Sequence, residues 1–242
     1  MFDNVLGSQH RIAELEWANY AATRPSARVT PGLDLILRED VILTGSRVLP
    51  MPDANHACLV RVSERGVEDL IAEVLRYFRE REAAPTFYLS PACTPKTLSE
   101  SLVARGFSRQ PADEAWMVLP DLSNVDTPPP SPDVTVRPIA RDEAPVFARV
   151  FLKAFDMPAE FAPPFVQLLQ PTVGLENAWH CLAFDGDRPI GTCSLLTHGS
   201  YGILGSAGIV RSRRGRGAAT TMTVAAIEEA RRRGVTLLML QT

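Results

Sequence analysis

This chain of 242 residues is short of cysteine, of long apolar runs and of excess positive charge, and each shortage excludes a class of protein. Its cysteines, Cys58, Cys93, Cys181 and Cys193, form no CxxC pair, so we expect buried free thiols rather than a zinc site or a disulfide framework. No window approaches the ~18 uninterrupted apolar residues of a membrane span, and the N-terminus lacks a signal-peptide core. These absences predict a cytoplasmic protein that uses neither a membrane nor a metal.

The overall charge is slightly negative, with 25 Lys and Arg against 28 Asp and Glu. Proteins that coat nucleic acid or an anionic membrane usually carry a basic excess, so this balance argues against both partners. Any local cluster of arginines therefore needs a local explanation.

One stretch, residues 120–133, resembles a linker because it contains five prolines in fourteen residues and almost nothing to bury. Such a segment resists helix and sheet and behaves as an extended spacer. We expect a first domain over residues 1–120, a linker over 121–132 and a second domain over 133–242.

The two predicted domains show the same order of elements: an apolar strand, a Val-Arg pair, a polar turn with glycine, a helix and another apolar strand. This order indicates an internal repeat of about 120 residues. In the second copy, the arginines at 231–233 end the helix and are interpreted as a solvated end that complements the helix dipole. In the first copy, Leu70, Val74, Tyr77 and Phe78 form an apolar stripe that predicts core packing.

The segment "GIVRSRRGRGAATTM", residues 208–222, leads from a strand through a glycine-rich turn into a helix. Backbone N–H groups and the positive end of the helix dipole then point at one spot, which suits a pyrophosphate. Gly215 and Gly217 remove Cβ atoms that would block close approach, and the nearby arginines add charge-assisted contacts. The residues predicted to bind it are Arg214, Gly215, Arg216, Gly217, Ala218, Ala219 and Thr220.

This loop is neither a Walker loop nor a Rossmann GxGxxG, but residues 214–219 resemble the signature [QR]xxGx[GA] of the GNAT superfamily of acyl-CoA-dependent N-acyltransferases. Upstream, "VTVRPIARDEAPVFARVFLKAF" resembles the first strand and helix of that family. In the first domain, "LSESLVARGFSRQPADEAWMVL" resembles its closing helix and hairpin. The resemblance implies an α/β (α+β) fold of two GNAT-like domains, each with a mixed, mostly antiparallel sheet, splayed central strands and flanking helices. The second domain then lacks its last helix and hairpin.

The resemblance also implies acetyl-CoA as co-substrate, with no metal. Ile209 and Val210 would pair with the pantetheine arm as if with an added strand, and Arg211 would lie at its edge. A neutral amine would attack the thioester directly, and a backbone N–H near Ile209 would stabilise the oxyanion. The first copy carries Glu64, Glu68 and other acids around its turn, so we expect it to have lost cofactor binding.

The general base is not evident, because the strand "YGILGSAGIV" lacks the Glu or Asp that the family often places there. Tyr201, Ser206 or His198 could relay a proton, although each also fits an ordinary hairpin or strand residue. The family's tyrosine acid lies after its fifth strand, a segment missing here. Either the native chain is longer, or the first domain or a second subunit, as in a homodimer, closes the site.

Residues for the acceptor are sought between the first two helices of the second domain, "FDMPAEFAPPFVQLLQPTVG". Asp156 and Glu160 could hold a cationic amine, and Phe155, Phe161 and Phe165 could form an apolar wall. The same segment is equally explained as a Pro-broken helical lid with solvated acids.

Three functions follow from these patterns. The first is an N-acetyltransferase with one working half, acting on a small-molecule or peptide amine. The second is a non-catalytic acetyl-CoA-binding or regulatory protein. The third is nucleic-acid binding through the arginines of the loop, which the net charge and the lack of interleaved aromatic residues disfavour.

Overall fold

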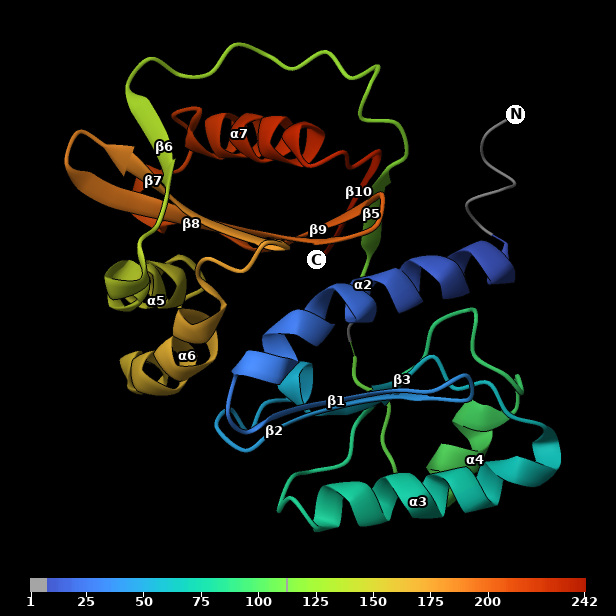
Figure 1. Ribbon diagram of the computed structural model, residues 1–242. Helices are drawn as coiled ribbons and strands as arrows, with labels where there is room; N and C mark the ends of the chain where they lie inside the picture. Colours follow the sequence, from blue (N-terminus) through green and yellow to red (C-terminus); the bar gives the residue numbers. More distant parts are fainter. Residues whose placement is uncertain (1–7, 112) are drawn as a thin grey trace. The chain divides into compact units, whose positions relative to one another are not determined.

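The computed structural model describes residues 8–111 and 113–242, and the chain divides into two compact units, Met1–Asp113 and Glu114–Thr242. Each unit has its own β-sheet with helices packed on its faces (Figure 1). The predicted α/β class with two mixed sheets is confirmed. The division falls at residues 113 and 114, ahead of the proline-rich segment rather than within it.

The first unit has a four-stranded sheet of order β1-β2-β3-β4, in which only the β3–β4 pair is parallel. Helix α2 begins after Ser8, whose hydroxyl accepts the N–H of Arg11 as a cap. The predicted stripe of α3 is buried in the core from Leu70 to Phe78, so that prediction is confirmed. The elements are α2 (Gln9–Val29), β1 (Leu33–Leu37), β2 (Ile42–Ser46), β3 (His56–Cys58), α3 (Val67–Arg79), β4 (Phe87–Tyr88) and α4 (Leu98–Ala104).

The second unit has a six-stranded sheet of order β5-β10-β9-β8-β7-β6, in which only β9 and β10 are parallel. Helix α7 covers one face, and α5 and α6 lie on the opposite face (Figure 1). Strands β7 and β8 form an antiparallel hairpin that turns between Asp185 and Arg188. The elements are β5 (Trp116–Leu119), β6 (Val134–Pro138), α5 (Ala144–Ala154), α6 (Ala162–Leu169), β7 (Ala178–Asp185), β8 (Arg188–His198), β9 (Tyr201–Ile209), α7 (Ala218–Arg232) and β10 (Leu237–Gln241).

Strand β5 differs from the sequence expectation of a hairpin that closes the first domain. It pairs antiparallel with β10 in the second sheet, where Leu119 lies opposite Leu238 and Trp116 opposite Gln241. Without β5, β10 would be an edge strand with a row of unpaired backbone groups. Strand β5, which precedes the linker in the sequence, therefore completes the sheet of the second unit beside β10.

The proline-rich segment is fastened along α7 rather than acting as a free spacer. Arg231 donates to the carbonyls of Leu122 (2.6 Å) and Val125 (2.7 Å), and Thr221 Oγ1 accepts the N–H of Ser131 (2.8 Å). The segment passes over the outer side of α7 on its way from β5 to β6 (Figure 1). Arg231 is exposed in the last turn of α7, as predicted for a solvated helix end, and its guanidinium also holds the proline-rich segment.

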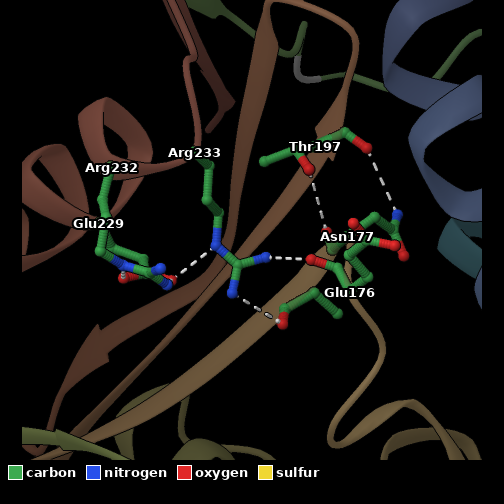
Figure 2. Close-up of polar contacts among 7 residues, drawn as sticks. Glu176, Asn177, Thr197, Glu229, Arg232 and Arg233 are labelled. Atoms are coloured by element: carbon green, nitrogen blue, oxygen red, sulfur yellow. Dashed lines mark hydrogen bonds and ion pairs between the residues drawn. The ribbon is translucent and has the colours of Figure 1, made fainter.

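Arg233 is partly buried and forms hydrogen bonds within the second unit. Its guanidinium bonds Glu229 on its own helix and the carbonyl of Glu176 just before β7 (Figure 2). Next to it, Thr197 donates its N–H to the carbonyl of Asn177 at 2.9 Å, and the Asn177 amide donates to the Thr197 carbonyl at 3.3 Å. The C-terminal end of α7 is thus anchored to the β7 and β8 strands.

The predicted state of the cysteines is also observed. Cys58, Cys93, Cys181 and Cys193 are all buried free thiols. Among the residues that the structure describes, no helix has both the length and the apolar character needed to cross a membrane.

Candidate functional site

Strands β9 and β10 pair over only part of their length. The parallel register joins residues 201–204 of β9 to 237–240 of β10 and stops there, while β9 continues to Ile209. Gly205, the first residue past this pairing, is exposed although β9 is a central strand. The two strands therefore diverge beside Gly205, as the splayed sheet of the sequence prediction required.

A β-bulge marks this point. Ser206 has a φ of 51°, in the left-handed region, and the β8–β9 register shifts between Thr192 and Ser194. The Thr192 hydroxyl donates to the Ser206 carbonyl at 2.7 Å and holds the bulge in place. Sequence reasoning treated Ser206 only as a proton relay and missed the bulge, although the small residues at 205–208 were its signal.

The loop after β9 forms the glycine-shaped helix entrance predicted for the pyrophosphate. Gly215 and Gly217 have φ values of 77° and 79°, which residues with a Cβ rarely adopt. Gly217 is the N-cap of α7, and the first intrahelical bond runs from the Thr221 N–H to its carbonyl. The N–H groups of residues 218–220 have no intrahelical acceptor, as at any helix start. Backbone donors and the helix dipole thus converge on the exposed glycines.

Arg214 has a bracing role in this loop. Its Nε donates to the carbonyl of Ile209 at 2.9 Å, and its Nη2 donates to the carbonyl of Ala154 at 2.8 Å. These bonds tie the loop to the end of β9 and to the last residue of α5. Arg216, next to the two glycines, is exposed at the helix entrance.

A basic pocket of about 120 Å³ lies beside the same loop. Val150, Ile190 and Val210 contribute its apolar lining, and four cationic side chains complete it. One of the four, Arg213, is paired with Asp185 at 2.7 Å. The loop is therefore bordered by an excess of positive charge in a protein that is acidic overall. The four cations are Arg149, Lys153, Arg188 and Arg213.

Aromatic side chains from α5 and α6 approach the bulged part of β9. Phe155, 47% exposed, lies so close to Gly208 that a Cβ there would stand 2.7 Å from its ring. Phe155 contacts Phe151 with ring centroids 4.7 Å apart, and Phe151 stacks on Phe165 at 4.4 Å. Of the predicted apolar wall, Phe155 and Phe165 thus belong to one aromatic row that reaches β9.

The two acids predicted for the acceptor follow this row. Asp156 and Glu160 are both exposed, and Asp156 adopts a φ of 53° directly after Phe155. Their carboxylates therefore stand at the surface, next to the aromatic row rather than within it.

The three weak candidates for proton transfer do not form one group. His198 and Tyr201 face each other across the β8–β9 hairpin. Ser206 lies five residues further along β9, about 17 Å away at the usual rise of a strand. Only Ser206 is at the divergence of β9 and β10.

In the first unit, the strand edge beyond the β3–β4 pairing is taken up by another part of the same chain. Leu59, the first residue past the last β3–β4 pair, has a φ of 47°, also in the left-handed region. Thr94 then forms a parallel bridge with Arg61: its N–H donates to the Val60 carbonyl at 2.8 Å, and its carbonyl accepts the Val62 N–H at 3.2 Å. The edge that a pantetheine arm would pair with is therefore occupied.

Other groups close the first unit further. Glu16, 5% exposed, accepts the Leu59 N–H at 3.1 Å and the Ser90 hydroxyl at 2.6 Å, and burial raises the pKa of its carboxyl. Glu68 and Asp69 lie in the first turn of α3, where they offset the helix dipole that an anion would need.

The comparisons with known proteins agree with this geometry. Residues 148–242 match the family model described as Acetyltransferase (GNAT) family. A search of curated proteins found no match. Among solved structures, a GCN5-related N-acetyltransferase from Kribbella flavida aligns with a TM-score of 0.67 at 15% identity, covering 98% of this chain and 87% of that one.

Two further structures share the fold over nearly the whole chain. A tandem GNAT protein from the clavulanic acid biosynthesis pathway aligns with a TM-score of 0.59 at 16% identity, covering 100% of this chain and 87% of that one. A GCN5-related N-acetyltransferase from Sphaerobacter thermophilus aligns with a TM-score of 0.56 at 21% identity, covering 96% and 82%.

The fold is thus shared with a tandem GNAT protein, and the segment that matches the GNAT family model includes β7–β10 and α7.

Proposed function

We propose that this protein transfers an acetyl group from acetyl-CoA to a primary amine, and that only its second unit does so. One observation carries the proposal: the part of β9 beyond residue 204, which does not pair with β10, leads directly into the glycine-rich loop that begins α7. Together they offer a strand edge for the pantetheine arm and N–H donors for the pyrophosphate. The basic pocket beside the loop adds long-range attraction for an anionic cofactor.

The contrast between the units supports a single working site. In the first unit, Thr94 pairs with the strand edge, and Glu68 and Asp69 stand at the helix entrance. In the second unit, the corresponding helix entrance has glycines and no acid in the first turn of α7. We therefore assign the cofactor to residues 209–211 and 214–220.

Catalysis at this site would rest on orientation. With the pantetheine along β9, the thioester would reach the bulge at Ser206, where the strands diverge. Backbone N–H groups near the bulge are better placed to stabilise the oxyanion than that of Ile209, which lies at the end of β9 next to the loop. A neutral amine would then attack from the side of Phe155 and Asp156, and no enzyme nucleophile is required.

We place the acceptor among small-molecule or peptide amines. The exposed carboxylates of Asp156 and Glu160 would attract an ammonium group, and the row from Phe155 to Phe165 would contact apolar parts of the molecule.

The test is to measure acetyl-CoA binding by calorimetry and CoA release with a panel of polyamines, aminoglycosides and peptides. We expect one binding site per chain and release of CoA with at least one amine. Tight binding with no turnover would favour a non-catalytic binding protein, and absence of binding would contradict the assignment of the cofactor site.

A further inference from the structure

A chain of hydrogen bonds runs through the second unit beneath the bulge. His180 on β7 is 7% exposed, and its ring joins two hydroxyls. Nε2 lies 2.9 Å from Thr172 Oγ1, which follows α6, and Nδ1 lies 2.8 Å from Ser194 Oγ on β8. The ring also meets the edge of Phe147 from α5, at 6.1 Å between centroids. Sequence reasoning did not single out any of these polar residues.

The position of each proton in this series of hydrogen bonds can be assigned by starting from Thr172. Thr172 Oγ1 donates its proton to the carbonyl of Leu169 at 2.7 Å, so toward His180 it must act as an acceptor. Nε2 of His180 therefore carries the ring proton, and Nδ1 presents a lone pair. The Ser194 hydroxyl consequently donates to Nδ1, and its own lone pairs remain for a donor on its other side.

Ser194 borders the open part of β9. It lies directly opposite Gly205 in the β8–β9 register, so the two residues project to the same face of the sheet. Gly205 is exposed, and no atom of the described chain lies within 4 Å of the position where its Cβ would stand. The Ser194 hydroxyl, in a residue that is 7% exposed, thus stands at the margin of the space where the thioester is expected.

We propose that Ser194 and His180 form the proton shuttle of the acyl transfer, an inference that rests on the proposed function. After the amine nitrogen bonds to the thioester carbon, its N–H bond breaks and the proton passes to Ser194 Oγ, while the Ser194 proton passes to His180 Nδ1. When the C–S bond breaks, the thiolate takes the electron pair, and the proton returns from Nδ1 through Oγ to sulfur. The net products are the amide and CoA thiol, and Thr172 keeps the ring oriented throughout.

The surroundings of His180 suit a shuttle that is neutral at rest. Burial, and secondarily the positive charge of Arg233, lowers the pKa of His180 to about 4. The other elements packed against the ring bring hydroxyls and the Phe147 edge to it. Nδ1 is therefore free of a proton at neutral pH, and a proton taken up there is passed on readily to the thiolate.

The test compares Ser194→Ala with Thr197→Ala, which removes a hydroxyl from the same strand but far from the bulge, where Thr197 Oγ1 contacts the carbonyl of Asn177. For an amine turned over by the native protein, we expect kcat to fall by about 100-fold in Ser194→Ala, in line with loss of general acid–base catalysis. The Kd for acetyl-CoA should change less than twofold in both variants. A loss of less than threefold in Ser194→Ala would overturn the proposal.

A second readout follows the protons directly. With ¹⁵N-labelled protein, the His180 ring should show the Nε2–H tautomer, and Ser194→Ala should shift the Nδ1 resonance while Thr197→Ala leaves it unchanged. An Nδ1–H tautomer in the native protein would overturn the shuttle even if the enzyme is active. If the native protein binds acetyl-CoA but turns over no amine, the proposed function itself fails and the shuttle with it.

Discussion

The backbone N–H of Ser131 donates to the hydroxyl of Thr221 at 2.8 Å, across 90 positions of sequence. The same hydroxyl contacts the carbonyl of Gly217, the N-cap of α7, at 3.1 Å. One side chain thus joins the proline-rich segment to the first turn of the helix that begins the candidate cofactor site.

Thr221→Val should destabilise the second unit by about 1 kcal/mol, because the partly buried N–H of Ser131 loses its acceptor while the side-chain volume is kept. The measurement is urea unfolding. The matched control is Thr220→Val, the exposed neighbour in the same turn, which should change stability by less than about 0.5 kcal/mol. Equal effects of the two variants would contradict a role for the Ser131 bond.

Gly215→Ala should weaken acetyl-CoA binding at least tenfold, because the new methyl group would enter the space that we propose for the phosphates. The control is Gly199→Ala in the β8–β9 hairpin. Both glycines have a positive φ, 77° and 54°, and at both no described atom lies within 4 Å of the added Cβ. The backbone strain, about 1–2 kcal/mol, is thus matched. Equal acetyl-CoA affinities in the two variants would remove the loop from the cofactor site.

A fragment of residues 114–242 should fold, whereas one of residues 121–242 should be less stable by several kcal/mol and prone to aggregation. The shorter fragment lacks β5 and exposes the edge of β10, with the loss of about 0.5–1.5 kcal/mol for each ladder hydrogen bond. Circular dichroism during urea unfolding and light scattering distinguish them. Equal stability would show that β5 is dispensable to the sheet.

Stability should fall as the pH is lowered from about 6.5 to 4, in part because of His180. Its folded pKa is about 4 against an ordinary 6.5, so in this window the unfolded chain binds a proton that the folded protein does not. This contribution is fully present above 6.5 and has a slope of about 1.4 kcal/mol per pH unit. His180→Gln should remove that slope. His56 in the first unit also has a pKa of about 4, so its own contribution to the pH dependence of stability should remain in the variant.

Much of the second unit follows from local patterns. The strand before the loop, the turn at Gly215 and Gly217, and the helix α7 depend on periodicity and glycine, and they appear where expected. The pairing of β5 with β10 depends on which sheet edge is vacant, a property of the tertiary structure that no window of sequence contains.

The bulge at Ser206 and the contact of His180 with Ser194 depend on strand register. A shift of one residue would turn each side chain to the opposite face, so their association could not be read from spacing alone. The pairing that occupies the strand edge of the first unit could likewise not be predicted from the sequence. The acids around Gly66 indicated a lost site, but the bridge from Thr94 to Arg61 requires the fold.

That bridge has a thermodynamic consequence. The first unit satisfies its strand edge internally, so its melting temperature should not respond to ligand. In the proposed function the corresponding edge of the second unit binds acetyl-CoA, so this unit should gain RT ln(1 + [L]/Kd) of stability, about 2.7 kcal/mol at a hundredfold excess over Kd. In thermal unfolding at increasing acetyl-CoA concentrations, the melting temperature of the second unit should therefore rise while that of the first unit stays constant. The first unit then serves as an internal control for the second.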